Sequence, residues 1–204
     1  MSDCNTVVMP IDKGSHLQNG ENATYKNEKN YQALTGSLTY AAMSTRHNIG
    51  YITQFLSQSN KGPSQHDWNA VKRVLWYLKG TRNIGIIYRR DLTTEGMNLD
   101  KLDHATPWGY CDTNYAEDPC DWKSMSGYTF MLAGGPIAWK SKKQASVALS
   151  TTEAEYYVLG ITCQEATWIK QICQELCMSV NNPIHIYTDN TSAVALSDNP
   201  VFHN

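Results

Sequence analysis

The sequence predicts an α/β protein, more narrowly an α+β domain with a mixed sheet, preceded by a group of helices. Two observations indicate this class. Up to Gly80, apolar residues recur every three or four positions, which is typical of amphipathic helices. After residue 105, three short aromatic or β-branched runs precede a long helical pattern, a fourth extended run and a short helix. The 204 residues, 41% of them hydrophobic, are enough for one or two domains with a sizeable core.

Three runs have apolar residues spaced by three and four, the pattern of amphipathic helices: 31–44, 47–58 and 64–80. The first two are separated by a break near Thr45. In the third, Ser64 and Asp67 favour an N-terminal capping box, and Gly80 favours the end of the helix. We expect these helices to form a small bundle, followed by a strand at residues 84–89.

The second half predicts a sheet crossed by a helix. The strand-like runs are WGYCDT, SGYTFMLA and PIAWKS, and the turn at residues 134–136 makes the last two a hairpin. A helix follows from Thr151 to about Cys177. Pro183 then opens the extended run IHIY, and a short helix comes last. Because a helical crossover precedes it, the fourth strand can lie parallel beside the first.

Charge divides the chain at about residue 90. Residues 1–90 carry 11 Lys and Arg against 5 acidic residues, whereas residues 91–204 carry 6 against 14. We predict a helical segment at 1–90 whose first 30 residues are a mobile lead-in, a linker at 91–104 and a domain at 105–204. The basic excess favours contact with a phosphate backbone, although an ordinary solvated helix face explains it equally well.

Two classes of protein are disfavoured by composition. No apolar run approaches the roughly 18 residues of a membrane span, and the first residues lack the basic start and apolar stretch of a secretory signal. We therefore expect a cytoplasmic protein that is not secreted and has no membrane partner. The six cysteines form no C-x-x-C pair and are expected to be reduced thiols.

Three acidic residues are the main candidates for function. Asp112 lies in the first strand-like run, Asp189 ends the fourth, and Glu155 lies near the start of the long helix. Counting by threes and fours from Glu155 gives the apolar stripe, so this carboxylate faces the sheet. Glu153 has a structural explanation instead, because Ser150 and Glu153 match a capping box in which Glu153 accepts from the amide of Ser150.

Such a cluster of carboxylates predicts a divalent metal. Three carboxylates within about 4 Å would repel by roughly 4 kcal/mol per pair at an effective dielectric of about 20, unless cations or protons neutralise them. Ligand sets made only of oxygen select hard ions, so we expect Mg²⁺ or Mn²⁺, with two ions in a complete site that hydrolyses phosphodiesters. The alternative is that each aspartate is an ordinary cap or turn residue.

Four long motifs resemble the ribonuclease H domain of copia-type LTR-retrotransposon Pol polyproteins: GYCDTNYAEDP, SMSGYTFMLAGGPIAWKSKKQASVALSTTEAEYYVL, EATWIKQICQEL and IYTDNTSAVALSDNPVFHN. Two upstream runs resemble the segment that joins reverse transcriptase to that domain: YQALTGSLTYAAMSTRHNIGYITQFLSQ and HDWNAVKRVLWYLKGTRNIGIIY. The resemblance extends over the chain from about Asp3. It implies a ribonuclease H-like fold behind a helical connection segment, with the remainder of a Pol polyprotein as a partner.

The resemblance also implies an activity, two-metal hydrolysis of the RNA strand of RNA–DNA hybrids during reverse transcription. Asp112, Glu155 and Asp189 match the family's catalytic and metal-binding carboxylates. Hybrids are recognised by shape, minor-groove contacts and the 2′ hydroxyl. Residues near the carboxylates, or basic residues on the third strand, are weaker candidates for nucleic-acid binding: Ser126, Thr151, Asn190, Lys140, Lys142 and Lys143. A virus-like particle or the nucleus are further possible locations.

One departure from the family pattern affects the predicted activity. The family continues with an H-x-D segment that carries a fourth carboxylate and with one more strand, whereas this sequence ends at Asn204. We therefore expect a Pol fragment with a truncated ribonuclease H domain, a hydrolase with weak or no activity. The alternative is a non-catalytic remnant that binds nucleic acid or serves a structural role. A phosphatase-like enzyme built on Asp112 is disfavoured, because Glu155 would then have no role.

Overall fold

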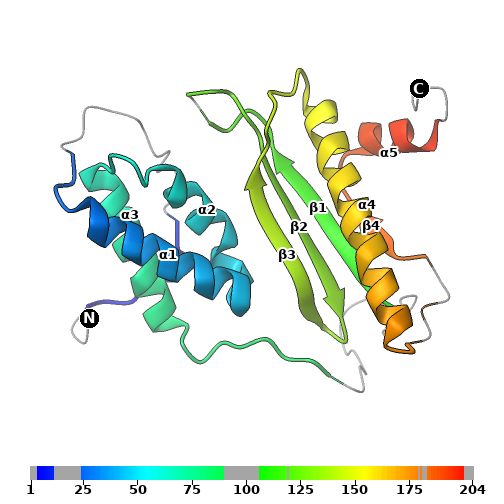
Figure 1. Ribbon diagram of the computed structural model, residues 1–204, viewed down its shortest axis with the longest axis horizontal. Coiled ribbons are helices and arrows are strands. Elements are labelled where there is room, and N and C mark those ends of the chain that lie inside the picture. The colour runs from blue at the N-terminus through cyan, green and yellow to red at the C-terminus, as the bar shows by residue number, and fades with distance from the viewer. Residues whose placement is uncertain are drawn as a thin grey trace. The chain divides into compact units, whose positions relative to one another are not determined.

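The computed structural model describes residues 4–11, 24–89, 106–118, 120–178, 180 and 183–199. The chain divides into two compact units, Met1–Gly85 and Ile86–Asn204, and each contains its own hydrophobic core. Figure 1 shows the helices of the first unit and the sheet with its helices in the second. The predicted linker at 91–104, and residues 1–3 and 12–23 of the predicted lead-in, lie outside the described residues.

In the first unit, the described residues form four helical elements: α1 (Glu28–Ser44), the short 3₁₀ helix η1 (His47–Ile49), α2 (Gly50–Gln58) and α3 (Gln65–Gly80). The predicted break near Thr45 and the three predicted helices are confirmed. The capping box of α3 is also present, because Asp67 N donates to Ser64 Oγ and Ser64 N donates to Asp67 Oδ2. Buried side chains from all four elements, including Tyr31, Leu56 and Val74, form the core of this unit.

The strand predicted at residues 84–89 is wrong. Residues 86–89 lie along the hairpin of the second unit, but they do not form a ladder. Arg89 N donates to Ala133 O at 2.8 Å, and the Tyr88 hydroxyl donates to Pro136 O at 2.7 Å. One main-chain bond at the turn of the hairpin does not make a strand, although apolar residues in this segment imitate the strand pattern.

The second unit contains a four-stranded mixed sheet in the order β3-β2-β1-β4: β1 (Trp108–Asn114), β2 (Met125–Leu132), β3 (Gly135–Lys143) and β4 (His185–Tyr187). β1, β2 and β3 form an antiparallel meander, and β4 lies parallel beside β1. The β2–β3 turn falls at Ala133 and Gly134, both with positive φ, one residue earlier than predicted. The predicted topology is confirmed.

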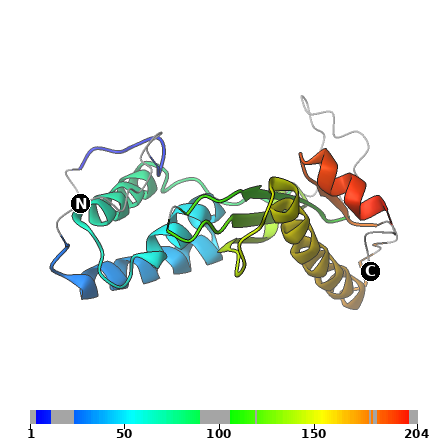
Figure 2. The ribbon, with the colours of Figure 1, turned by 90° about the horizontal axis from the view of Figure 1, so that it is seen from above.

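Helix α4 (Thr151–Glu175) is the crossover between β3 and β4, and α5 (Thr191–Asp198) follows β4. Figures 1 and 2 show α4 lying against the sheet. Alternate residues of β1 are buried, and Cys111 joins Phe130, Val158 and Ile169 in the core beneath α4. Most of the apolar stripe predicted for α4 is buried, but Leu176 lies just past the last turn and is 67% exposed.

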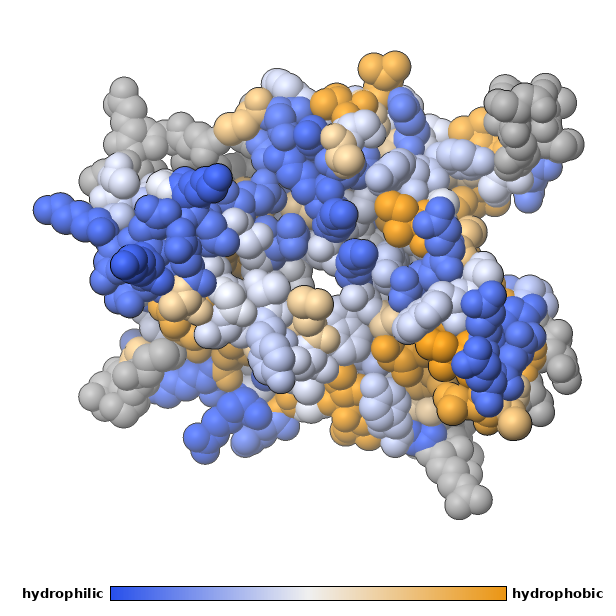
Figure 3. Space-filling model, in the orientation of Figure 1, coloured by the Kyte–Doolittle hydropathy of each residue, from blue (hydrophilic) through white to orange (hydrophobic). Residues whose placement is uncertain are grey.

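The surface of the described residues is mixed in character. On the face shown in Figure 3, hydrophobic residues form small areas separated by hydrophilic residues, as is normal for a surface in water. Among the described residues, no helix combines the length and apolar character that crossing a membrane requires.

Candidate metal centre

The topology of the sheet brings Asp112 and Asp189 together. In the parallel pair β1 and β4, Tyr110 lies opposite Tyr187. Each aspartate comes two residues later on its own chain segment, Asp112 within β1 and Asp189 just after β4. Because parallel strands run in the same direction, both side chains lie at the same end of the sheet.

Helix α4 supplies the third carboxylate. Glu155 lies in the first turns of α4, on the face that packs against the sheet, and is only 7% exposed. Asp112, Glu155 and Asp189 each offer one oxygen such that these atoms all lie within 4.8 Å of one another, and both aspartates are exposed. The three carboxylates therefore form a group that can hold a metal ion at this end of the sheet.

The amide of Thr113 fixes part of this group. Thr113 N donates to Asp112 Oδ1 at 2.7 Å and to Glu155 Oε1 at 3.2 Å. The other oxygen of Glu155, Oε2, is buried and accepts no hydrogen bond from the described residues. A buried carboxylate oxygen without a donor is costly, so this atom points to a ligand, either a cation or a proton.

Electrostatics at Glu155 agree with that conclusion. Burial, and then the negative charges of Asp112 and Asp189, raise the pKa of Glu155 above its ordinary value, although the amide of Thr113 acts in the opposite direction. The protein thus places a carboxylate where its negative form is unfavourable unless positive charge is nearby. Oxygen-only ligands fit a hard divalent cation.

The start of α4 is held by a cap that differs from the prediction in one detail. Ser150 Oγ accepts from Glu153 N at 3.1 Å, as expected for the N-cap. Glu153 Oε2 accepts from the amide of Leu149 at 2.7 Å, where the prediction had the amide of Ser150. Glu153 still has a structural role, and Glu155 is left facing the sheet.

The predicted nucleic-acid contacts fall into two groups. Ser126 is buried on β2, where its Oγ accepts from Gln144 Nε2 at 2.8 Å, and Asn190 Oδ1 accepts from Ala193 N at 2.9 Å and caps α5. Thr151 is exposed in the first turn of α4. Ser126 and Asn190 therefore each form a hydrogen bond that stabilises the fold, whereas Thr151 is exposed.

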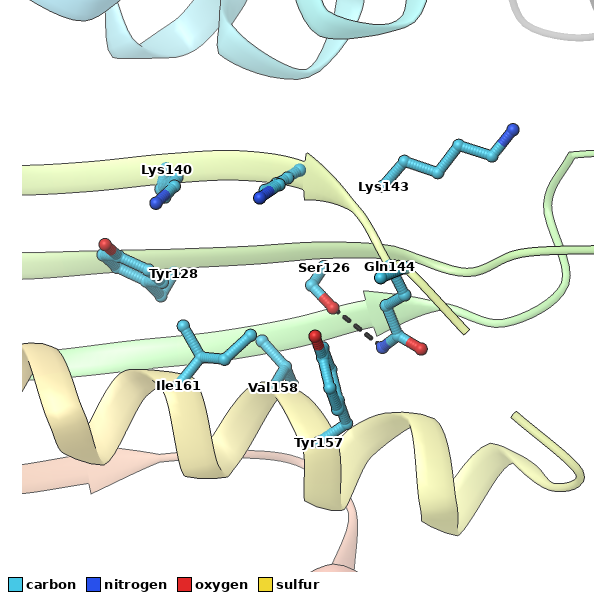
Figure 4. A pocket seen from close by; sticks show the side chains of 10 residues that line it. Ser126, Tyr128, Lys140, Lys143, Gln144, Tyr157, Val158 and Ile161 are labelled. Atoms are coloured by element: carbon cyan, nitrogen blue, oxygen red, sulfur yellow. Dashed lines mark hydrogen bonds between the residues drawn. The ribbon is translucent and has the colours of Figure 1, made fainter. Parts of the chain in front are cut away.

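The three lysines of β3 also differ from one another. Lys143 Nζ pairs with Asp118 and, at 2.8 Å, with Asp121. Lys140 and Lys142 are exposed, and their ammonium groups form no ion pair or hydrogen bond with the described residues. All three line a pocket of about 100 Å³ between β3 and α4 (Figure 4).

Sequence reasoning did not select several side chains of this pocket, among them Gln144 and Tyr157. Gln144 is buried, and its Nε2 also donates to Ala154 O at 3.0 Å, so it ties β3 to the start of α4. Tyr157 lies in the second turn of α4 and is 41% exposed. Nothing in the spacing of Gln144 marked it, whereas Tyr157, an aromatic residue on the polar face of α4, was a signal that could have been used.

Comparison with known proteins places the chain among transposon proteins. It is 41% identical over 173 residues to the retrovirus-related Pol polyprotein from transposon RE2 of Arabidopsis thaliana, which covers 85% of this chain and 11% of that protein. The polyprotein from transposon RE1 of the same plant is 39% identical over 198 residues, covering 97% of this chain and 12% of that protein. The polyprotein from transposon TNT 1-94 of Nicotiana tabacum is 38% identical over 173 residues, covering 85% and 12%. No family model and no solved structure matches.

The fold and the acidic group define a class, an α+β domain with ribonuclease H-like topology behind a helical segment, and the fold prediction is confirmed. The chain belongs to the family of copia-type retrotransposon Pol polyproteins, as its resemblance indicated. It spans about an eighth or less of the length of these three relatives. It is therefore related to one part of each polyprotein.

Proposed function

We propose that the second unit is a metal-dependent ribonuclease H that hydrolyses the RNA strand of an RNA–DNA hybrid. The observation that carries the proposal is the convergence of Asp112, Glu155 and Asp189, with the buried Oε2 of Glu155 lacking a donor among the described residues. The Pol relatives support the proposal because reverse transcription produces hybrids that must be cleared. Mg²⁺ or Mn²⁺, with two ions in a complete site, is the proposed cofactor.

The residues present fit such a cofactor. All three donors are carboxylates, two exposed and one buried, and the exposed pair leaves the site open to a phosphodiester. When bound, the ions would supply Lewis-acid activation of water and charge neutralisation at the departing 3′ oxygen. The three side chains come from β1, α4 and the end of β4, so the rigid framework of the fold sets their spacing.

Each residue then has a distinct part in binding. Glu155, anchored through Oε1 to Thr113 N, presents Oε2 as a fixed ligand atom. Asp112 is anchored to the same amide through Oδ1, which couples the positions of the two carboxylates. Asp189 is exposed beyond β4 and completes the group from the neighbouring parallel strand. Together they hold positive charge beside the phosphate to be cleaved.

Cleavage of a labelled hybrid tests the proposal. The wild-type protein is incubated with a hybrid labelled on either strand, in Mg²⁺ or Mn²⁺, beside Glu155→Gln and the matched control Glu153→Gln. We expect cleavage of the RNA strand alone, abolished by Glu155→Gln and retained by Glu153→Gln, whose side chain caps the helix. Equal cleavage by wild type and Glu155→Gln, or cleavage in excess EDTA, would contradict the proposal.

A second candidate is a domain that binds nucleic acid without cleaving it. The observation that favours it is the presence of two exposed lysines, Lys140 and Lys142, without partners among the described residues. In that case a hybrid would raise the melting temperature of the protein in EDTA, the effect would fade with salt, and no RNA would be cut.

A further inference from the structure

The groove between β3 and α4 is a second feature of the ribonuclease H-like unit, separate from the acidic group. Lys140 lies opposite Tyr128 in the β2–β3 ladder, and Lys142 lies opposite Ser126. Because alternate residues share a face of a sheet, these two lysines lie on the face that α4 covers. Tyr157 and Ile161 of α4 form the opposite wall (Figure 4).

The floor of the groove is built from buried polar groups. Gln144 is 4% exposed, and its side-chain Nε2 donates to Ser126 Oγ and to Ala154 O. Its main-chain N–H donates to Ser124 O at 2.8 Å. The floor is therefore fixed by the fold. Lys143 adds no unpaired positive charge to the groove, because Asp118 and Asp121 bind its ammonium group. Figure 4 shows Lys143 extending away from Tyr157 and Ile161.

The charge of the surroundings makes the two free lysines conspicuous. Residues 91–204 carry only 6 Lys and Arg against 14 acidic residues, and 3 of those 6 lie within the four residues 140–143. A polyanion would be repelled from most of this unit. Favourable contacts require cations, and among the described residues the unpaired ammonium groups of β3 and a loaded metal centre supply them.

The position of the groove fits a substrate that reaches both places. Lys142 pairs with Ser126, and Ser126 pairs with Thr113, whose amide binds Asp112 and Glu155. Two steps across a sheet place the main chain of Lys142 about 10 Å from that of Thr113. Measured along the axis of a duplex, where each strand carries one phosphate per about 3.4 Å, this distance corresponds to about three nucleotides.

We infer that Lys140 and Lys142 form a phosphate-binding groove that holds the sugar–phosphate backbone of the nucleic acid about three nucleotides from the metal centre. The inference rests on the proposed function, since it takes a nucleic acid as the substrate. Two lysines at alternate positions of one strand, about 6.6 Å apart, contact two phosphates and carry no information about sequence.

The test is hybrid binding in EDTA, where metal-dependent cleavage cannot occur. Fluorescence anisotropy with a labelled RNA–DNA hybrid is measured as a function of salt for wild type and for Lys140→Gln/Lys142→Gln. The matched control is Lys123→Gln/Lys170→Gln, which removes the same charge from the same unit outside the groove. We expect the groove variant to lose roughly 10- to 60-fold in affinity at about 0.1 M salt and to reduce the salt slope by about two, and the control to change neither appreciably.

One further variant tests whether the charge alone is responsible. Lys140→Arg/Lys142→Arg retains the charge and is expected to restore binding. Equal weakening by the groove variant and the control, or an unchanged salt slope, would overturn the inference. So would a groove variant that aggregates with hybrid affinity intact, since β3 is an edge strand and lysines there can simply prevent pairing with another chain. Failure of the proposed cleavage is read separately, from RNA hydrolysis in Mn²⁺ with Glu155→Gln as the control.

Discussion

Replacing Glu155 by Gln should stabilise the metal-free protein, which is the reverse of the usual effect of changing a buried residue. The substitution keeps the shape of the side chain and an oxygen that accepts from Thr113 N, but it removes one of three negative charges. At the 4.8 Å limit that holds for these oxygens, each pair repels by about 0.9 kcal/mol in water and about 3.5 kcal/mol at an effective dielectric of 20. Both aspartates are exposed, so the lower figure applies, and two pairs sum to about 2 kcal/mol.

The assay is thermal or urea unfolding near pH 7.5 in EDTA and again in excess Mn²⁺. In EDTA, the free energy of unfolding of Glu155→Gln should exceed that of wild type by about 2 kcal/mol, which raises the melting temperature by several degrees for a domain of this size. In Mn²⁺ the order should reverse, because wild type gains about 2.7 kcal/mol at a free ion concentration near 100 times Kd. Glu153→Gln is the control. It removes a charge from the same helix start, where that charge favours the helix, so it should be slightly destabilising in both buffers.

The pH dependence of unfolding independently checks whether Glu155→Gln raises or lowers the stability of the metal-free protein. The folded-state pKa of Glu155 is raised above its ordinary 4.5, so the stability from neutral Glu155 is present below that value and lost as pH rises through the folded pKa. The advantage of Glu155→Gln in EDTA should therefore shrink toward pH 4. A Glu155→Gln protein that is less stable than wild type in EDTA at neutral pH would refute this account of the acidic group.

Three other predictions concern residues that are not members of the acidic group. Burial raises the pKa of the Cys111 thiol to about 11, so its protonated form contributes stability that is lost as pH rises from about 9 through 11. At pH 8, a maleimide should therefore modify the exposed Cys120 long before it modifies Cys111, as measured by mass spectrometry. Equal labelling rates would contradict this. Gly109→Ala should cost about 1–3 kcal/mol in urea unfolding, because its Cβ would lie 2.8 Å from the Phe130 ring, and an unchanged midpoint would show that the ring moves freely. Ser64→Ala should cost about 1 kcal/mol of helix-cap stability in the first unit, and no change in unfolding would mean that the cap of α3 contributes nothing.

The sequence predicted the parts of the fold that repeat along the chain. Helices, the antiparallel meander and the parallel pairing of β4 with β1 follow from apolar spacing and from the crossover rule. It also selected Glu155 over Glu153, because the buried face of a helix is readable from residues three and four apart. The segment at 84–89 was misread because its apolar residues pack beside a hairpin turn without a ladder, which no local pattern reveals.

The side-chain roles on β3 were beyond the sequence for a similar reason. Lys140, Lys142 and Lys143 look alike in a run of basic residues, and their difference depends on which face of the strand each occupies and on a loop more than 20 residues away. Asp118 and Asp121 in that loop bind Lys143. Long-range partners of this kind become visible only when the chain is folded, so the two lysines left free could not be separated from the third beforehand.

The two proposals predict a coupling between metal and nucleic acid. Without cations, Asp112, Glu155 and Asp189 oppose the approach of a phosphodiester, so the lysines of the groove hold the backbone against that repulsion. Divalent ions at the carboxylates would remove the repulsion and add attraction. Because linkage is reciprocal, the hybrid must then raise the affinity of the site for Mn²⁺ by the same factor that Mn²⁺ raises its affinity for the hybrid. If the lysines of the groove contact only the nucleic-acid backbone, replacing them should leave this coupling factor unchanged. Glu155→Gln, in contrast, should abolish the coupling. Measuring the coupling therefore distinguishes the contribution of the groove to nucleic-acid binding from that of the acidic group.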